Sequence, residues 1–286
     1  MDAEQRYSLI EIEKKLKAND LPLSGVTALG SSKFHIAQPA FYAGIAMHAG
    51  DRLRPDIQDA LAVSPQDKYR EEDPFTDLFI RDFPIQIICR DSRFEYDVNR
   101  EYQRGIYDEH KKTWGLKVWK HDLTAEQRAQ SLAKHQEFHD LLDIITSFML
   151  QHNQRAVLFD MHSYCYQRET RQAWYEDDKP EVNVGTKAVN RELFGEMIHN
   201  FMQDLATIRV DSKPVRVLEN DIFFGGHLSR RLSAKHYERV LVLALEFKKT
   251  FMDEWSGQVY PEILETLITG FQSATRKLVS HDFFTA

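Results

Sequence analysis

The sequence predicts an α/β fold in which a mixed, mostly parallel sheet is covered by helices on both faces. Short apolar runs are separated by longer stretches with helical spacing of their apolar residues. The runs lack the alternation typical of half-exposed strands, so both of their faces are expected to be buried. With 286 residues, 42% of them hydrophobic, the chain can bury a large core. We therefore expect one domain over residues 1–286.

Four stretches are predicted to be helical. Leu9, Ile12 and Leu16 recur at helical spacing, so residues 1–35 are expected to form an N-terminal helical extension. Thr124 and Gln127 have the spacing of a capping box, in which each side chain satisfies a backbone amide of the other residue. The predicted helices cover residues 2–18, 124–153 and 187–208 and the segment that begins at Pro261.

Five apolar runs are predicted to be strands. They are FYAGIAM (41–47), FPIQIIC (83–89), AVLF (156–159), VRVL (215–218) and RVLVLAL (239–245). Their buried character on both faces is typical of strands in a sheet that helices cover from both sides.

Three of these runs end on groups that bind metals or move protons. The first is followed by His48, the third by Asp160 and His162, and the fifth by Glu246. The functional crevice of an open α/β sheet lies beyond the carboxyl ends of its strands, so we expect these side chains to converge. Two imidazoles with nearby carboxylates suit a catalytic zinc site, which keeps one position open for water. Each residue alone also fits a structural role, such as a hydrogen-bonded histidine or the first solvated acid past a strand.

Composition excludes several classes of function. The formal net charge is −7, and no stretch concentrates Lys and Arg, so no nucleic-acid partner is expected. Cys89 and Cys165 both lie in apolar segments, which favours a reducing compartment over a disulfide framework. The start of the chain is too charged for a signal peptide, and no apolar run reaches the roughly 20 residues that span a bilayer. We expect a cytoplasmic protein without a membrane segment.

Seven short motifs, in this order along the chain, resemble those of the N-formylglutamate amidohydrolase family. The strand-borne histidine, the Asn-Arg pair and the late strand glutamate are also similar to zinc carboxypeptidases. The resemblance covers roughly residues 40 to 255 and implies a zinc-carboxypeptidase-like fold. The motifs are MHAGDR (47–52), TDLF (76–79), DVNR (97–100), FDMHSY (159–164), NVGT (183–186), GGHLSRR (225–231) and LALEFKKTFMDE (243–254).

The resemblance implies a zinc ion held by His48 and His162. Two aspartates compete for the place of the carboxylate ligand. Asp77 matches an acid in the later family segment and is favoured, whereas Asp51 has the His-x-x-acid spacing of carboxypeptidases. Either residue also fits a structural role at a loop or a helix start. Asp160, two residues before His162, lies on the same strand face and is a candidate to orient that histidine.

The resemblance also implies catalytic and substrate-binding residues. Glu246 matches the general base, which takes a proton from the attacking water and passes it to the leaving amine. Asn99 and Arg100 resemble the pair that grips a substrate carboxylate, since a guanidinium matches a carboxylate in a bidentate fork. Arg100 is also a candidate catalytic donor to the developing oxyanion.

The GGHLSRR segment adds a second candidate subsite. Gly225 and Gly226 allow close backbone approach to a ligand, and Arg230 matches the family's loop arginine. Arg230 is the alternative donor to the oxyanion, and two arginines would suit a dicarboxylate such as glutamate. Structural readings stay open, since Arg100 also suits a salt bridge with Asp97 and Arg230 a solvated turn.

The expected function is zinc-dependent hydrolysis of the N-acyl amide of a small acidic amino acid, with N-formyl-L-glutamate as the substrate that the resemblance implies. Two alternatives stay open. One is a hydrolase of another N-acyl amino acid or peptide on the same scaffold, because one fold hosts many substrates. The other is a metal-free binding or regulatory homologue whose strand-end residues are held by hydrogen bonds.

Overall fold

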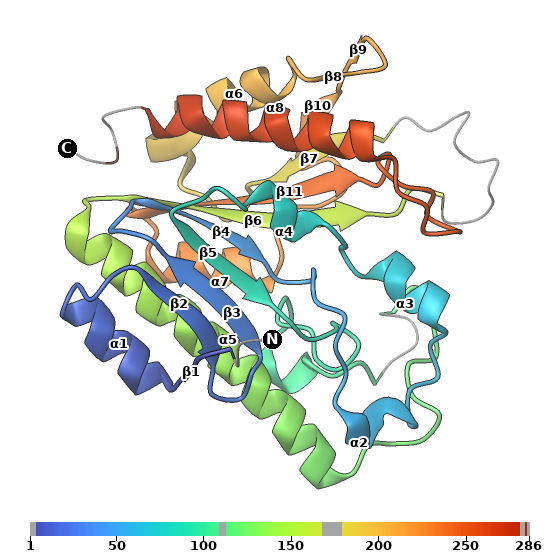
Figure 1. Cartoon of the computed structure of the whole chain (residues 1–286). Coiled ribbons are helices and arrows are strands. Elements are labelled where there is room, and N and C mark those ends of the chain that lie inside the picture. The colour runs from blue at the N-terminus through green and yellow to red at the C-terminus, as the bar shows by residue number, and fades with distance from the viewer. Residues whose placement is uncertain (1–3, 109–112, 168–178, 281–283, 285–286) are drawn as a thin grey trace.

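The fold is described from a computed structural model of the chain, which covers residues 4–108, 113–167, 179–280 and 284. A nine-stranded mixed sheet runs through the molecule (Figure 1). In spatial order its strands are β1 (Arg6–Tyr7), β2 (Leu23–Thr27), β3 (Ser32–Ile36), β5 (Ile85–Cys89), β4 (Tyr42–Ala46), β6 (Ala156–Tyr164), β11 (Val240–Lys248), β7 (Val182–Gly185) and β10 (Val217–Glu219).

The central strands are parallel. β5, β4, β6 and β11 pair in parallel, so their carboxyl ends meet at one edge of the sheet. β3 and β7 flank this group in antiparallel pairing, while β1 with β2 and β7 with β10 are again parallel. The predicted mixed, mostly parallel sheet is confirmed.

Helices cover both faces of the sheet. A hydrophobic cluster on each side joins the helices to the strands. One face carries α4 (Thr76–Phe79), α6 (Arg191–Leu205) and α8 (Pro261–Val279), and the other carries α1 (Leu9–Lys17), α5 (Ala125–His152) and α7 (His227–Lys235). Figure 1 shows α6 and α8 above the sheet in that view, and α1 and α5 below it.

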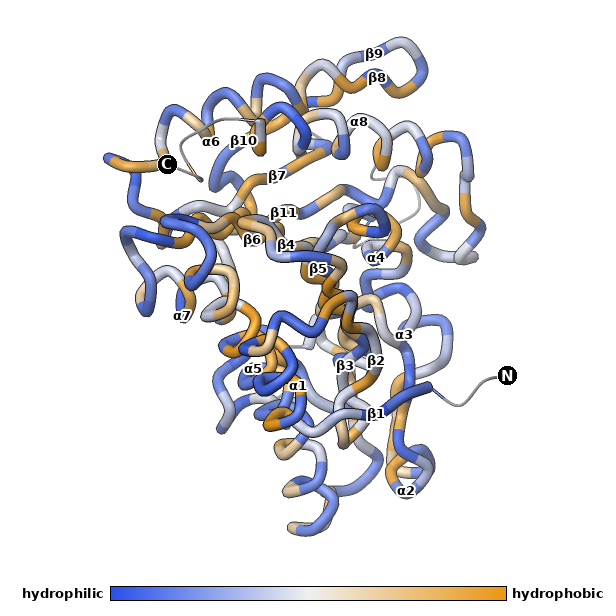
Figure 2. The backbone as a smooth tube through the Cα atoms, turned by 60° about the vertical axis from the view of Figure 1, so that its left-hand side comes forward, coloured by the Kyte–Doolittle hydropathy of each residue, from blue (hydrophilic) through white to orange (hydrophobic). Residues whose placement is uncertain are grey.

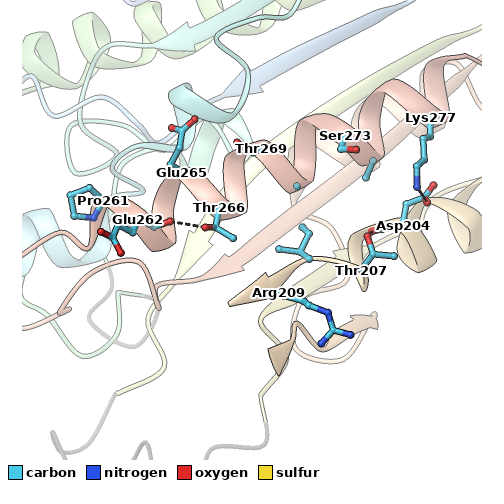
Figure 3. Close-up of a pocket in the computed structure, with 13 residues that line it drawn as sticks. Asp204, Thr207, Arg209, Pro261, Glu262, Glu265, Thr266, Thr269, Ser273 and Lys277 are labelled. Carbon is cyan, nitrogen blue, oxygen red and sulfur yellow. Dashed lines mark hydrogen bonds and ion pairs between the residues drawn. The ribbon is translucent and has the colours of Figure 1, made fainter. Parts of the chain in front are cut away.

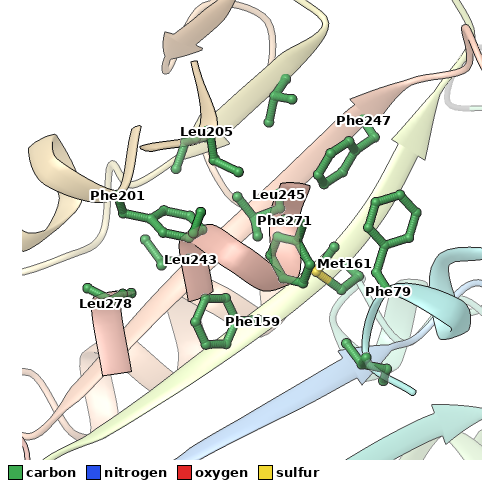
Figure 4. Packing of buried hydrophobic residues seen from close by; sticks show 14 of the residues in the cluster. Phe79, Phe159, Met161, Phe201, Leu205, Leu243, Leu245, Phe247, Phe271 and Leu278 are labelled. Atoms are coloured by element: carbon green, nitrogen blue, oxygen red, sulfur yellow. The ribbon is translucent and has the colours of Figure 1, made fainter. Parts of the chain in front are cut away.

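The core between the sheet and α8 is rich in aromatic side chains. Phe271 of α8 packs against Phe159 of β6 and Phe247 of β11, with ring centroids 5.7 and 6.1 Å apart (Figure 4). Figure 2 shows that the hydrophobic stretches gather in the central strands, while helix turns that face outward are hydrophilic. Burial of this apolar area fixes the register of β6 and β11, whose ends carry functional residues.

Two long connections lie beyond the carboxyl ends of β4 and β5. They are held by a third cluster, in which Ile57, Phe94 and Trp119 are buried. The short helices in these connections are α2 (Pro55–Gln58), α3 (Pro65–Glu71) and the 3₁₀ helix η1 (Tyr102–Arg104), and a separate small hairpin joins β8 (Arg209–Val210) to β9 (Lys213–Pro214). The third cluster gives these connections a core of their own, which positions the side chains they carry.

Most predicted elements form, with shifted ends. Thr124 and Gln127 make both bonds of the predicted capping box at the start of α5. The strand predicted for AVLF continues to Tyr164, because β11 pairs with it as far as Lys248, so Asp160 and His162 lie inside β6. The helix predicted from residue 187 begins at Arg191, where the Asn190 side chain caps it.

The N-terminal region differs from the helical extension expected over residues 1–35. Only α1 is helical there, and β1 and β2 add two strands to one edge of the sheet through pairing with β3. The LSGVT sequence of β2 lacks a clear strand pattern, so pairing with the neighbouring strands decides its conformation. Among the helices in the described ranges, none is long and apolar enough to cross a membrane.

Candidate active site

Three neighbouring parallel strands bring together the residues predicted at their ends. His48 lies two residues past β4, and His162 and Glu246 are directly paired in the register of β6 with β11. The ring centroids of His48 and His162 are 5.0 Å apart. Both imidazoles are buried and Glu246 is half-buried. The predicted convergence of these side chains is therefore observed.

Asp73 is the carboxylate that joins the two histidines. Its Oδ2 lies 3.1 Å from Nδ1 of His162 and 3.3 Å from Nδ1 of His48. Ligand atoms of the three buried residues all lie within 4.8 Å of one another. Within the described parts of the chain, no other set of three or more His, Cys, Asp or Glu side chains comes this close.

Asp77 and Asp51, the two aspartates considered from the sequence, do not belong to this group. Asp77 lies in the first turn of α4, where burial raises the pKa of its carboxyl group. Asp51 is exposed, and its backbone carbonyl accepts a bond from Lys68. The connection after β4 folds back so that the amide of Asp73 donates to the carbonyl of His48. As a result, the carboxylate beside the two histidines is that of Asp73, and neither Asp77 nor Asp51 lies there. Asp73 precedes Pro74 in the acidic EEDP run.

An acid also lies on the other side of each histidine, as a hydrogen bond for His48 and as a close contact for His162. Nε2 of His48 lies 2.7 Å from Oδ1 of Asp97, and Nε2 of His162 lies 3.1 Å from Oδ1 of Asp160. Such carboxylates orient a ligating imidazole and keep the lone pair of the opposite nitrogen directed inward. Asp160 was a sequence candidate for this position, whereas Asp97 was considered only as a partner of Arg100.

Opposing effects set the charge of the carboxyl groups. Burial works against ionisation of Asp73, but the hydrogen bond with His162 and the charge of both imidazoles outweigh it and hold the pKa of its carboxyl group well below the usual value. Burial raises the pKa of Glu246 to about 8, although His162 partly offsets this effect. Asp73 is thus a carboxylate, while Glu246 is poised near neutrality to take up and release a proton.

The donor set fits a divalent metal ion of the zinc type. Two nitrogens and one carboxylate oxygen are common zinc ligands, and in a tetrahedral site such atoms lie about 3.3 Å apart. The two distances from Asp73 to the histidines are 3.1 and 3.3 Å. Nδ1 of His48 is buried and makes no hydrogen bond to any described residue. A cation would satisfy this nitrogen and balance the surrounding carboxylates.

A cavity of about 90 Å³ opens onto this group. His48, Asp73, His162 and Glu246 all line it. A larger hollow of about 720 Å³ lies between α6, β8 and α8 (Figure 3). Its lining includes Thr266, Ser273 and the ion pair of Lys277 with Asp204, but no histidine. The smaller cavity is therefore the one that has the groups for catalysis.

The predicted substrate residues divide into two sets. Asn99 lines the cavity, and its Oδ1 accepts a bond from the amide of Leu228. A Cβ at Gly226 would lie 2.1 Å from that oxygen, so glycine is required there. Gly225 has a φ of +99°, which favours glycine as well. These three residues form one packed corner of the site.

The two predicted arginines do not line the cavity. Nε of Arg100 lies 3.5 Å from Oδ2 of Asp97, and its guanidinium stacks over Tyr107. Arg230 is exposed, and its Nη1 donates to the carbonyl of Gly225. The cavity instead contains Arg93, whose Nη2 donates to Oδ2 of Asp97 over 3.1 Å. Arg93 lies four residues before Asp97, outside the quoted motifs, so only its proximity to DVNR could have pointed to it.

Comparison with known proteins agrees with the fold and the strand-end motifs. The family model described as N-formylglutamate amidohydrolase matches residues 45–252. No curated protein matches the sequence. The crystal structure of N-formylglutamate amidohydrolase from Ralstonia eutropha JMP134 has a TM-score of 0.66 at 13% identity, covering 86% of this chain and 97% of that one.

Two further solved structures are similar. A gene product of Agrobacterium tumefaciens gives a TM-score of 0.60 at 16% identity, covering 88% of this chain and 96% of its own. A metallo-carboxypeptidase from Burkholderia cenocepacia gives 0.41 at 15% identity, covering 96% of this chain and 70% of its own. At these identities, the first two similarities establish a shared fold.

Proposed function

Because the chain belongs to the N-formylglutamate amidohydrolase family, we propose that it hydrolyses the N-acyl amide of a small acidic amino acid. The substrate that the family suggests is N-formyl-L-glutamate, which would yield glutamate and formate. The observation that carries this proposal is the buried group of His48, Asp73 and His162, placed beside Glu246 on one cavity.

Three side chains of this group would hold a zinc ion. The ligands are Nδ1 of His48, Nδ1 of His162 and Oδ2 of Asp73, with Asp97 and Asp160 orienting the two imidazoles. When bound, zinc polarises a carbonyl group and lowers the pKa of water to about 7.

Glu246 supplies the proton transfers. Its carboxylate takes a proton from the water that attacks the formyl carbon and returns it to the amide nitrogen as the C–N bond breaks. The new C–O bond ends in formate, and the protonated nitrogen becomes the amino group of glutamate. Pairing of Glu246 with His162 across β11 and β6 fixes this carboxylate beside the ligand group. The pKa of about 8 in the metal-free chain suits both steps, and a bound cation would lower it.

Arg93 and Asn99 are two donors that line the cavity. Arg93 lines the cavity, and its charge lowers the pKa of Glu246. It would stabilise negative charge on the formyl oxygen during attack. Asn99 has its Oδ1 bonded to the amide of Leu228, which leaves its amide nitrogen to donate to the α-carboxylate of the substrate.

A hydrolase of another N-acyl amino acid is the second candidate. It is favoured by the position of Arg230, which was expected to bind a second carboxylate but lies outside the cavity. The acyl group and the amino acid of the substrate therefore have to be determined separately for this site.

Turnover of a substrate panel tests the proposal. Zinc-loaded protein would be assayed with N-formyl and N-acetyl derivatives of glutamate, aspartate, glutamine and methionine. We expect N-formyl-L-glutamate to have the highest kcat/KM. No hydrolysis of any member would contradict the amidohydrolase proposal, and a preference for another member would move the substrate to the second candidate.

A further inference from the structure

Lys249 is a buried cation in the catalytic cavity that the proposed mechanism does not use. It follows the last residue of β11 and lies three residues after Glu246. Its side chain is only 1% exposed and lines the same cavity as Glu246, His162 and Asp73. Lys249 is therefore buried from solvent but borders the cavity of the candidate active site.

The ammonium group of Lys249 has no acidic partner. Nζ donates to the carbonyl oxygens of Arg70 and Glu72, both over 2.6 Å, and lies 3.6 Å from Sγ of Cys165. Within the described ranges, no carboxylate oxygen lies close enough to Nζ of Lys249, at 4 Å or less, to form an ion pair. By contrast, Arg93 is paired with Asp97 over 3.1 Å. Lys249 is thus a buried charge held by neutral acceptors alone.

An isolated buried charge is costly unless a counter-charge accompanies it. An ammonium group has three donors, and two of those on Lys249 go to carbonyl oxygens. The third is within reach of only a thiol, which is a weak acceptor. A carboxylate that enters the cavity would supply both the missing charge and a strong acceptor.

Ser163 provides a second unsatisfied group in the same cavity. Its Oγ is buried and has no hydrogen-bond partner among the described residues. It lies on β6, which runs beside β11 in the sheet. A ligand that reaches Lys249 would therefore find a hydroxyl donor on the neighbouring strand.

We propose that Lys249, with Ser163 of the same cavity, receives the side-chain carboxylate of the substrate. This inference rests on the proposed function and adds a selectivity residue to it. β6 lies between β4, which precedes His48, and β11, which precedes Lys249. Asn99 and Arg93 lie on the His48 side, where Asp97 contacts both His48 and Arg93. Nζ of Lys249 lies at the carbonyl of Glu72, next to Asp73, so the α-carboxylate and the side-chain carboxylate would be held by separate groups of the cavity.

The inference predicts selectivity for acidic over isosteric neutral side chains. N-formyl-L-glutamine keeps the α-carboxylate of N-formyl-L-glutamate but has an uncharged amide in the side chain. Because a hydrogen bond to a charged group adds appreciable affinity, the glutamate compound should bind about 10- to 100-fold more tightly.

Binding in a background without turnover tests this directly. Zinc-loaded Glu246→Gln protein would be titrated calorimetrically with both compounds, alone and combined with Lys249→Gln, Lys249→Arg or Lys249→Met. Lys249→Gln keeps a donor for the backbone carbonyls but removes the charge. We expect the preference for N-formyl-L-glutamate to disappear in the Gln and Met variants and to persist in the Arg variant. Lys248→Gln is the matched control, because Lys248 pairs with Glu181 and does not line the cavity.

Several results would overturn the inference. The first is that the Glu246→Gln protein binds the two compounds equally or binds neither. The second is that the preference for N-formyl-L-glutamate survives removal of the charge. The third is that Lys249→Gln weakens the binding of both compounds equally. The last result would make Lys249 a support for the backbone before Asp73. A wild type that binds N-formyl-L-glutamate through Lys249 but does not hydrolyse it would contradict the proposed function alone.

Discussion

The active site has two halves that differ in how their residues are positioned. His162 and Glu246 lie on β6 and β11, where a continuous parallel ladder sets them side by side. Asp73 and Asp97 lie on the long connections after β4 and β5, which a small hydrophobic cluster of their own stabilises. A strand register can be foreseen from apolar patterns, whereas the path of a long connection depends on contacts between residues distant in sequence. The strand half supplies the proposed proton-transfer group Glu246, and the connections supply Asp73, Arg93 and Asn99 to the same cavity.

The largest effect on turnover is expected in the strand half. Glu246→Gln removes the proton carrier but none of the three proposed metal ligands, so kcat should fall about 100- to 10,000-fold while zinc content stays unchanged. Steady-state kinetics with metal analysis would measure both quantities. Glu265→Gln is the control, since Glu265 pairs with the exposed Arg81. Unchanged turnover in Glu246→Gln would remove Glu246 from the mechanism.

The next largest effect is on zinc affinity, and it compares Asp97 of the connections with Asp160 of the strand half. Asp97→Asn and Asp160→Asn each weaken the orientation of one ligand, so zinc affinity should fall about 10- to 100-fold. The loss should be greater for Asp97, which lies 2.7 Å from His48, than for Asp160, which lies 3.1 Å from His162. Competition with a chelator would measure the affinity. The reverse order would mean that the strand half dominates metal binding.

A smaller effect on catalysis is expected at Asn99 and Gly226, which are not proposed metal ligands. Gly226→Ala would place a Cβ 2.1 Å from Oδ1 of Asn99 and force that side chain to move. Loss of its bond to the α-carboxylate should raise KM about tenfold and leave kcat nearly unchanged. Asn99→Ala should show the same pattern. A fall in kcat with an unchanged KM would assign Asn99 to the transition state instead.

The difference between the halves also explains what the sequence could predict. The apolar runs located β4, β5, β6 and β11, and their ends pointed to His48, His162 and Glu246. The end of β6 was placed too early, because polar residues there continue the ladder with β11 as far as Tyr164. β1 and β2 were missed because pairing with neighbours, not composition, makes them strands.

Except for Ser163 inside β6, the residues that sequence reasoning missed lie on the connections or beyond a strand end. Asp73 reaches the histidines through a fold-back over 25 residues, and spacing alone favoured Asp77 or Asp51. Arg93 and Asp97 are held by mutual ion pairing that no short motif encodes. In LEFKKTF, Lys249 has the same residue type as Lys248 and both side chains are buried, so only the structure shows that Lys249 lines the cavity and Lys248 does not.

The zinc content of the purified protein tests most directly whether His48, Asp73 and His162 hold a metal ion. Protein purified without added metal would be analysed for zinc beside Asp73→Ala, with Asp77→Ala and Asp51→Ala as matched controls. We expect about one zinc per chain in the wild type and in both controls, and none in Asp73→Ala, because three protein ligands are needed to hold a catalytic zinc. A wild type that takes up no zinc even on reconstitution, or an Asp73→Ala variant that keeps it, would contradict the site described here.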